Sequence, residues 1–275
     1  MNAARDDPFA GRKPLIGMIH LPSLPGAPNY SGQSIASIAE GAVRDAQLLQ
    51  EGGIDGLLLQ NSNDHPPVKR VPASTVAAYA VIATEVSRFA SIPLGINVLK
   101  SDPIATIGIA TAVGARFVRL KGYVGAEIGA EGLTEGCAAE AIRLRRELSG
   151  EATLEIWADA LQPTSRTLSG VSAIELARWC VEFGHADRVV ITADSLAESL
   201  AVIENARRHL SVPLILGGGV DPGTVRRALD GSDGIIAGRY LRAGSLAGPI
   251  ERGRVQAFVE AAGRGPGTAP TVAES

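Results

Sequence analysis

The chain has 275 residues, of which 45% are hydrophobic and 20% are charged, and its formal net charge is −3 at pH 7. This balance fits a packed globular core and excludes a wholly disordered chain. A nucleic-acid binder needs a basic field and stacking surfaces, so the acidic charge and the 4% aromatic content argue against that class. The two cysteines have no CxxC spacing, which excludes a disulfide framework and a cysteine-built zinc site.

The sequence contains no segment typical of secretion or membrane insertion. Residues 1–14 lack the apolar stretch of a secretory signal. The run Val76–Ala83 is apolar but falls short of the ~18 residues that span a bilayer. We therefore expect a soluble, cytoplasmic protein without a transmembrane anchor.

Short aliphatic runs alternate with longer amphipathic stretches along the chain. The runs have the length of strands and lie at Leu15–His20, Ile54–Asn61, Pro93–Leu99, Arg116–Lys121, Thr153–Asp159, Arg188–Thr192, Pro213–Gly217 and Asp233–Gly238. The stretches predict helices at Ser34–Glu51, Pro72–Ala90, Pro103–Val113, Thr134–Leu148, Ser172–Phe183, Leu196–Leu210, Pro222–Leu229 and Pro249–Ala262. A helix after every strand predicts parallel strands joined by right-handed crossovers.

Eight such units favour a single (β/α)₈ TIM barrel, with an open doubly wound sheet as the alternative. The barrel is expected to span residues 14–263, after an N-terminal extension at residues 1–13. Residues 264–275 are rich in Gly, Pro and Ala and predict a disordered tail.

The alternation of side chains along a strand predicts which residues face the barrel interior. Arg119 and Lys121 share one face of their strand with Phe117, and Asp159 shares one with Glu155. Arg119 and Glu155 lie on neighbouring strands, so we expect them to pair, either as a structural ion pair or within a polar ligand pocket. The same parity predicts that four more residues face the barrel interior, namely Met18, His20, Gly95 and Asn97.

Two glycine-rich loops near the end of the chain predict a phosphate site. In barrels, the loops after strands seven and eight often bind phosphate through backbone N–H groups. The expected phosphate-binding residues are Gly217, Gly218, Gly219, Gly238 and Arg239. Glycine lets the backbone approach an anion closely, and Arg239 adds a charged donor. The alternative is that these glycines only form tight turns.

Active sites of such barrels lie at the carboxyl ends of the strands. The candidate catalytic residues there are His20, Asp64, Lys121 and Asp159. The candidate substrate-binding residues are Asn61, Asn97, Asp102, Arg119 and Asp194. Acids, amides, a histidine and a lysine in one ring favour acid/base chemistry.

Several of these residues keep a second interpretation. His20 could instead anchor a loop, Asp159 could pair with Lys121, and Asp194 could cap the helix that starts near Leu196. Lys121 suits either a Schiff base or the binding of a carboxylate or phosphate. His20, Asp64 and Asp159 could meet at a metal, so a divalent ion such as Mg²⁺ stays open, and no other cofactor is indicated. The segment Gly122–Gly136 is interpreted as a lid or as a long connection.

Several motifs resemble the BtpA/SgcQ family. They are Gly17-Met18-Ile19-His20-Leu21-Pro22, Leu24-Pro25-Gly26-Ala27-Pro28, Gly52-Gly53-Ile54-Asp55-Gly56, Gly95-Ile96-Asn97-Val98-Leu99 and Asp233-Gly234-Ile235-Ile236-Ala237-Gly238. The resemblance extends from about Leu15 to Phe258. It implies a (β/α)₈ barrel related to ribulose-phosphate-binding barrels. It also implies either a role in photosystem I biogenesis, as for the founding member, or a nucleosidase or sugar-metabolism role, as for other members.

Two functional hypotheses follow. The first is an enzyme that acts by acid/base chemistry on a phosphorylated sugar, nucleoside or related small metabolite. The second is a non-catalytic biogenesis or assembly factor for a membrane protein complex. The first predicts a small, phosphorylated ligand as partner and no nucleic acid, and a homo-oligomer is left open.

Overall fold

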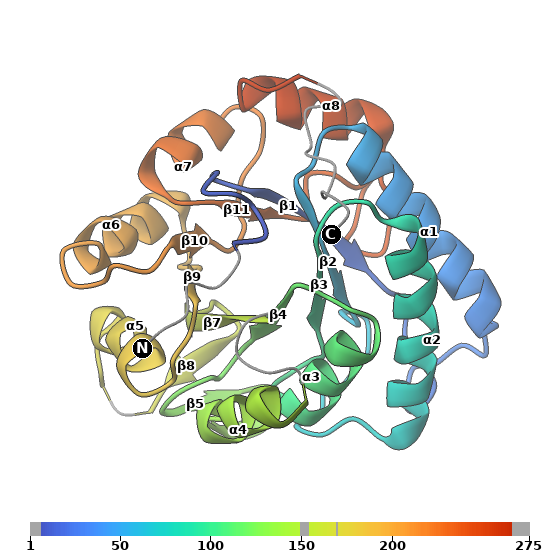
Figure 1. Ribbon diagram of the computed structural model, residues 1–275, viewed down its shortest axis with the longest axis horizontal. Coiled ribbons are helices and arrows are strands. Elements are labelled where there is room, and N and C mark those ends of the chain that lie inside the picture. Colours follow the sequence, from blue (N-terminus) through green and yellow to red (C-terminus); the bar gives the residue numbers. More distant parts are fainter. Residues whose placement is uncertain (1–6, 149–153, 169, 266–275) are drawn as a thin grey trace.

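The computed structural model describes residues 7–148, 154–168 and 170–265. Eight parallel strands close into a barrel in the order β1-β11-β10-β9-β7-β4-β3-β2 (Figure 1). The strands are β1 (Leu15–His20), β2 (Gly56–Gln60), β3 (Leu94–Asn97), β4 (Phe117–Leu120), β7 (Glu155–Leu161), β9 (Arg188–Ile191), β10 (Leu214–Leu216) and β11 (Ile235–Ala237). The single (β/α)₈ TIM barrel is therefore confirmed, and the open sheet is wrong.

Eight helices surround this barrel. They are α1 (Ile35–Glu51), α2 (Ala73–Phe89), α3 (Pro103–Ala112), α4 (Ala138–Leu148), α5 (Ala173–Glu182), α6 (Leu196–Ala206), α7 (Val225–Gly231) and α8 (Arg252–Ala261). Several begin where a side-chain oxygen accepts a backbone N–H: Ser172 and Glu175 form a capping box at α5, and Asp102 caps α3 ahead of Pro103.

A small antiparallel sheet interrupts the alternation of strands and helices. It has the order β6-β5-β8 and consists of β5 (Ala126–Gly129), β6 (Gly132–Glu135) and β8 (Ser165–Thr167). We call this sheet the cap, because the loops that follow β4 and β7 carry it at the carboxyl end of the barrel. Its strand β6 includes Thr134 and Glu135, the first two residues of a predicted helix, so α4 begins at Ala138 instead of Thr134. Thr153, the predicted start of β7, lies outside the described residues.

The barrel interior contains an apolar cluster that the side-chain parity predicts. Met18, Phe117 and Trp157 belong to it, together with Phe9 from the N-terminal extension. The rings of Phe117 and Trp157 stack with centroids 4.3 Å apart, and Phe9 packs edge-on against Phe117 at 6.0 Å. Residues 7–13 of the predicted extension thus close the amino end of the barrel with a buried side chain.

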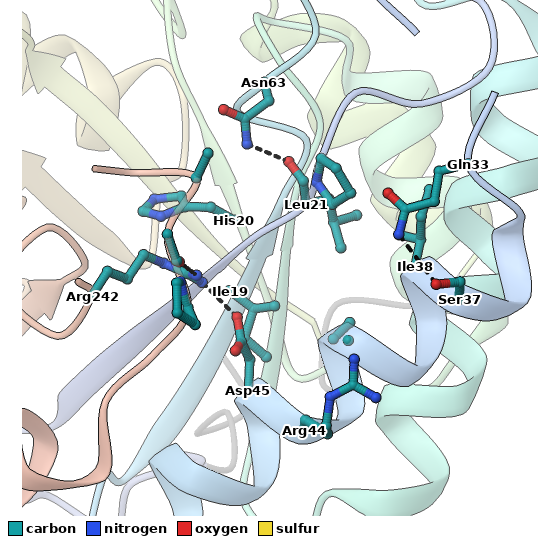
Figure 2. Close-up of a pocket in the computed structure, with 16 residues that line it drawn as sticks. Ile19, His20, Leu21, Gln33, Ser37, Ile38, Arg44, Asp45, Asn63 and Arg242 are labelled. Carbon is teal, nitrogen blue, oxygen red and sulfur yellow. Dashed lines mark hydrogen bonds and ion pairs between the residues drawn. The ribbon is translucent and has the colours of Figure 1, made fainter. Parts of the chain in front are cut away.

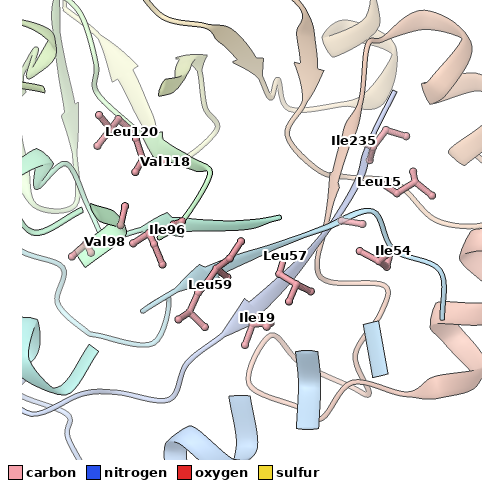
Figure 3. Close-up of a cluster of buried hydrophobic side chains, with 14 of the residues drawn as sticks. Leu15, Ile19, Ile54, Leu57, Leu59, Ile96, Val98, Val118, Leu120 and Ile235 are labelled. Atoms are coloured by element: carbon pink, nitrogen blue, oxygen red, sulfur yellow. The ribbon is translucent and has the colours of Figure 1, made fainter. Parts of the chain in front are cut away.

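A larger apolar core lies between the strands and the helices (Figure 3). It takes the outward side chains of the strands, such as Ile19, Leu57, Leu59, Ile96, Val118 and Leu120. Burial of these aliphatic side chains on one strand face, and of the aromatic cluster on the other, fixes the register of the barrel.

Arg264, which we expected in a disordered tail, forms an ion pair with Asp55 and donates to the carbonyl oxygen of Lys13. The expectation is wrong for this residue, because Asp55 offers it a buried partner. Residues 266–275 lie outside the described residues. Among the residues described, none of the helices has the length and apolar character needed to cross a membrane.

Candidate functional site

Three buried polar side chains lie in register at the carboxyl end of the barrel, which we call the mouth. His20 on β1 pairs with Gln60 on β2, and Gln60 pairs with Asn97 on β3. Each is less than 10% exposed. His20 Nδ1, Gln60 Oε1 and Asn97 Oδ1 have no hydrogen-bond partner within the described part of the chain. A buried polar atom left unpaired costs about 1–3 kcal/mol, so this row favours a ligand or water at the mouth.

The structure pairs Arg119 with Asp159 instead of Glu155. Arg119 Nε and Nη2 donate to the two carboxylate oxygens of Asp159 at 2.8 and 2.7 Å, and both side chains are buried. The register explains the error, because Glu155 lies opposite Phe117, nearer the amino end. Glu155 is held there by Arg188 and by Trp157 Nε1.

Lys121 follows β4 directly, with the parity of Arg119. Its ammonium group makes no ion pair or hydrogen bond with any described residue, so the predicted pair with Asp159 is not formed. Burial lowers the pKa of Lys121 to about 8, and the charges of Arg119 and Lys100 act in the same direction. At pH 7 the amine of Lys121 is then neutral in about a tenth of the molecules, a far larger fraction than for an exposed lysine.

The cap lies beside Lys121 and is tied to the barrel by Lys100. Lys100 Nζ pairs with Glu131 and lies 3.3 Å from Glu127 Oε1, and its side chain is 5% exposed. Gln162 Nε2, after β7, also donates to Glu127 at 2.7 Å. The segment Gly122–Gly136 is therefore a folded β-hairpin whose carboxylates are bound to the mouth.

His20 is a neutral imidazole at the mouth. Burial lowers its pKa to about 3, and the charges of Arg242, Lys121 and Arg119 lower it further. The ring lies against Gly238, where a Cβ atom would be 2.8 Å from His20 Cε1.

A cavity of about 370 Å³ opens beside His20, between α1 and the loop after β11. Arg242 lines this cavity, and its guanidinium group donates to Asp45 at 2.8 Å (Figure 2). The same group donates to the carbonyl oxygen of Met18. Arg242 is 3% exposed. Its contacts thus fix the loop after β11 against β1 and α1.

Asp64 and Asn61 connect the loops at the mouth through hydrogen bonds. Asp64 accepts the N–H of Leu24 at 2.8 Å and Nδ2 of Asn61 at 2.7 Å. Asn61 Oδ1 accepts the N–H of Leu99 at 2.8 Å. Burial raises the pKa of Asp64 despite these donors. These bonds tie together the loops after β1, β2 and β3.

Asp102 and Asp194 also lie outside the ring of unpartnered atoms. Asp102 caps α3 and accepts the N–H of Val71 and a bond from Arg70. Asp194 is 67% exposed and pairs with Arg166 at 3.4 Å. The helix after it is capped by Ser195, so the predicted capping role of Asp194 is wrong.

The two predicted phosphate loops are neighbours, because β10 and β11 are adjacent in the barrel. In each of the two loops, three consecutive N–H groups donate to no described residue. They are those of Gly218, Gly219 and Val220 in the first loop and of Gly238, Arg239 and Tyr240 in the second. Gly218 and Gly219 have φ values of +143° and +74°, which favour glycine. Helix α7 starts at Val225, later than the predicted start at Pro222. The side chain of Arg239 is exposed and forms no hydrogen bond or ion pair with the described part of the chain.

The predicted metal trio of His20, Asp64 and Asp159 does not assemble. In the described ranges, no three His, Cys, Asp or Glu side chains are grouped so that they could hold a metal ion. Asp159 is bound by Arg119, and Asp64 is bound by backbone and amide donors.

Sequence reasoning missed Gln60, Lys100 and Arg242. The inward parity of Leu58 could have identified Gln60, because the two lie two residues apart on β2. Lys100 and Arg242 come from loops, where no periodicity applies, and their partners Glu131 and Asp45 are distant in sequence.

Two solved structures have the same fold. N-(5'-phosphoribosyl)anthranilate isomerase from Pyrococcus furiosus superposes with a TM-score of 0.56 and 14% identity, covering 90% of this chain and 98% of that one. Thiamine phosphate pyrophosphorylase from the same organism gives a TM-score of 0.55 and 14% identity, with 91% and 95% covered. At this identity the likeness shows the barrel fold alone.

Sequence relatives are closer. An uncharacterized protein of Pyrococcus abyssi is 38% identical, over 85% of this chain and 89% of its own length. The photosystem I biogenesis protein BtpA of Synechocystis is 32% identical, over 94% of this chain and 90% of its own length. The model of the BtpA family matches residues 11–264, and the chain therefore belongs to the BtpA family.

Proposed function

We propose that this protein is an enzyme that acts by acid/base chemistry on a phosphorylated sugar, nucleoside or related small metabolite. One observation carries the proposal: two adjacent loops at the mouth present N–H groups without acceptors, at the same end as the unpartnered polar atoms of β1, β2 and β3. Backbone N–H groups of glycine loops bind phosphate well. Structures of the same fold include an enzyme named for a phosphoribosyl compound.

The substrate phosphate would bind the N–H groups of Gly218, Gly219 and Gly238, with Arg239 at the rim. The N–H of Gly217 donates to the carbonyl oxygen of Ile191, so Gly217, which we predicted as a phosphate ligand, would only shape the loop. The rest of the molecule would then lie over the row that begins at His20. A neutral imidazole can accept a proton from the substrate, and Asn97 Oδ1 can accept a hydrogen bond from a hydroxyl group. We assign Arg119 to orienting a substrate oxygen together with Asp159.

The remaining predicted residues receive supporting roles in this proposal. Asp64, Asn61 and Asp102 hold the loops that shape the mouth, since their oxygens are already occupied by N–H donors. Asp194 lies at the surface, next to the cap, and would contact only a part of the substrate that projects from the mouth.

Thermal unfolding with inorganic phosphate and ribose 5-phosphate tests the phosphate site. A ligand at a hundredfold excess over its Kd stabilises the native state by about 2.7 kcal/mol. We expect a rise in Tm with both compounds and a smaller rise for Arg239→Gln. Arg143→Gln, on the exposed face of α4, is the matched control and should respond like the wild type. No rise in Tm with either compound would contradict the proposal.

The second candidate function is a biogenesis or assembly factor, favoured by the name of the Synechocystis relative. It predicts a stable protein partner and no turnover of small molecules. Affinity capture from an extract of the source cells, followed by mass spectrometry, distinguishes the two. A stoichiometric membrane-protein partner together with an unchanged Tm in phosphate would favour this candidate.

A further inference from the structure

Three buried basic side chains at the mouth hold carboxylates, in the pairs Arg119–Asp159, Lys100–Glu127 and Arg242–Asp45. Lys121 lies among them. It has no carboxylate or hydrogen-bond partner among the described residues. Ser101 Oγ donates to the carbonyl oxygen of Lys121 at 2.7 Å, which fixes its backbone beside the cap. The structure thus holds the main chain of Lys121 in place and leaves its amine unengaged.

The surroundings of this amine favour its neutral form. Arg119 and Lys100 are positive neighbours, and the carboxylates of Asp159 and Glu127, which also face Lys121, are bound by those two cations. His20 approaches from β1 and is itself neutral. A lysine becomes nucleophilic when burial or an adjacent cation lowers its pKa, and Lys121 has both.

The composition of the chain supports a role that requires an amine. The chain contains 26 Lys and Arg residues, of which only four are lysines. Most buried cations that pair with a carboxylate are arginines, such as Arg119, Arg145 and Arg188, and Lys100 is a lysine that does so. A guanidinium group binds anions well but is not a nucleophile at neutral pH.

We propose that Nζ of Lys121 condenses with the carbonyl group of a phosphorylated aldehyde or ketone to form an imine. This inference rests on the proposed function, because the glycine loops would hold the phosphate of the same molecule. It narrows the substrate class to open-chain phosphorylated carbonyl compounds.

The condensation has two steps. The nitrogen lone pair of the neutral amine first adds to the carbonyl carbon, the C=O π electrons move to oxygen, and a proton passes from nitrogen to oxygen. We assign the relay of this proton to the neutral imidazole of His20, which lies at the same mouth. The hydroxyl group then takes a second proton and leaves as water, while the nitrogen lone pair forms the C=N bond of a protonated imine.

Reductive trapping tests this proposal. Sodium cyanoborohydride converts the imine to a secondary amine, which peptide mapping locates. The probes are glyceraldehyde 3-phosphate and dihydroxyacetone phosphate, applied at pH 7. Lys13 and Lys69 are exposed and report the background. We expect labelling of Lys121 to exceed theirs roughly tenfold or more, because its neutral fraction is larger. Labelling of Lys121 should also reach half of its maximal rate near pH 8.

Lys121→Arg keeps the positive charge and removes the amine, and Lys69→Arg is the matched control. We expect Lys121→Arg to lose the selective adduct and to keep its rise in Tm with inorganic phosphate, which also shows that it is folded. Lys69→Arg should keep both. Two results would contradict the imine proposal and leave the phosphate site intact. One is labelling of Lys121 no stronger than that of Lys13 and Lys69. The other is no adduct with either probe in a wild-type protein that phosphate stabilises. Absence of the phosphate response in the wild type would instead contradict the proposed function.

Discussion

Replacing Asp159 by Asn measures how much the buried ion pair with Arg119 stabilises the fold. Asp159 has a side chain that is 0% exposed, and both of its oxygens accept from Arg119. The variant leaves the guanidinium charge buried without a counter-charge. Removal of one partner of a buried ion pair typically costs about 3–5 kcal/mol. For a chain of this length, that cost lowers Tm by roughly 6–20 °C.

Urea unfolding followed by circular dichroism measures this cost. Asp194→Asn is the matched control, because Asp194 is 67% exposed and its ion pair with Arg166 is a surface contact. The control should change the free energy of unfolding by less than about 0.5 kcal/mol. The double variant Arg119→Met/Asp159→Leu should recover much of the loss, since it removes both charges. A cost below about 1 kcal/mol for Asp159→Asn would refute the argument that the pair is enclosed.

Three further predictions concern the two ends of the barrel. Phe9→Ala should lower the free energy of unfolding by about 3–5 kcal/mol, because the ring is 1% exposed among Phe117 and Trp157. Gly238→Ala should displace the imidazole of His20, lower the free energy of unfolding by about 1–3 kcal/mol and reduce the rise in Tm with phosphate. The control Gly108→Ala lies in α3 with open space around the added methyl group, and should raise the free energy of unfolding by about 1 kcal/mol. The pKa of His20 is lowered to about 3 in the folded protein, whereas in the unfolded chain it is about 6.5. Between these values only the unfolded chain binds a proton at His20, so the free energy of unfolding falls as the pH drops below about 6.5. Between pH 7 and 5 the wild type should lose about 2 kcal/mol more than His20→Gln in urea unfolding, and equal losses would show that the imidazole is not buried.

The sequence predicts the barrel well because its signals are local. Each strand is a short aliphatic run, and several helices begin at a residue that caps them, such as Ser34, Ser172 or Ser195. Parity along β4 and β7 also predicts that Arg119, Trp157 and Asp159 point into the barrel, as they do. These features depend on neighbouring residues of the same segment.

Side-chain pairing inside the barrel could not be predicted in the same way. Whether Arg119 meets Glu155 or Asp159 depends on the register between β4 and β7 and on the competing cation Arg188 from β9. The sequence did not predict the hairpin at β5 and β6 for a similar reason. Its carboxylate Glu131 pairs with Lys100, which lies about thirty residues earlier in the sequence. Tertiary partners decide these contacts.

The two ends of the barrel differ in how completely their polar groups are bonded. At the amino end, both oxygens of Glu155 accept from Arg188, and Arg188 also binds Asp7 at 2.6 Å and lies over the ring of Phe9. At the mouth, equally buried atoms of His20 and its neighbours on β2 and β3 lack any described partner. The same chain thus satisfies its charged groups where it closes the barrel and leaves donors and acceptors open where it does not. Since unpaired buried groups reduce stability, this row of three unpaired atoms on adjacent strands favours a ligand at the mouth.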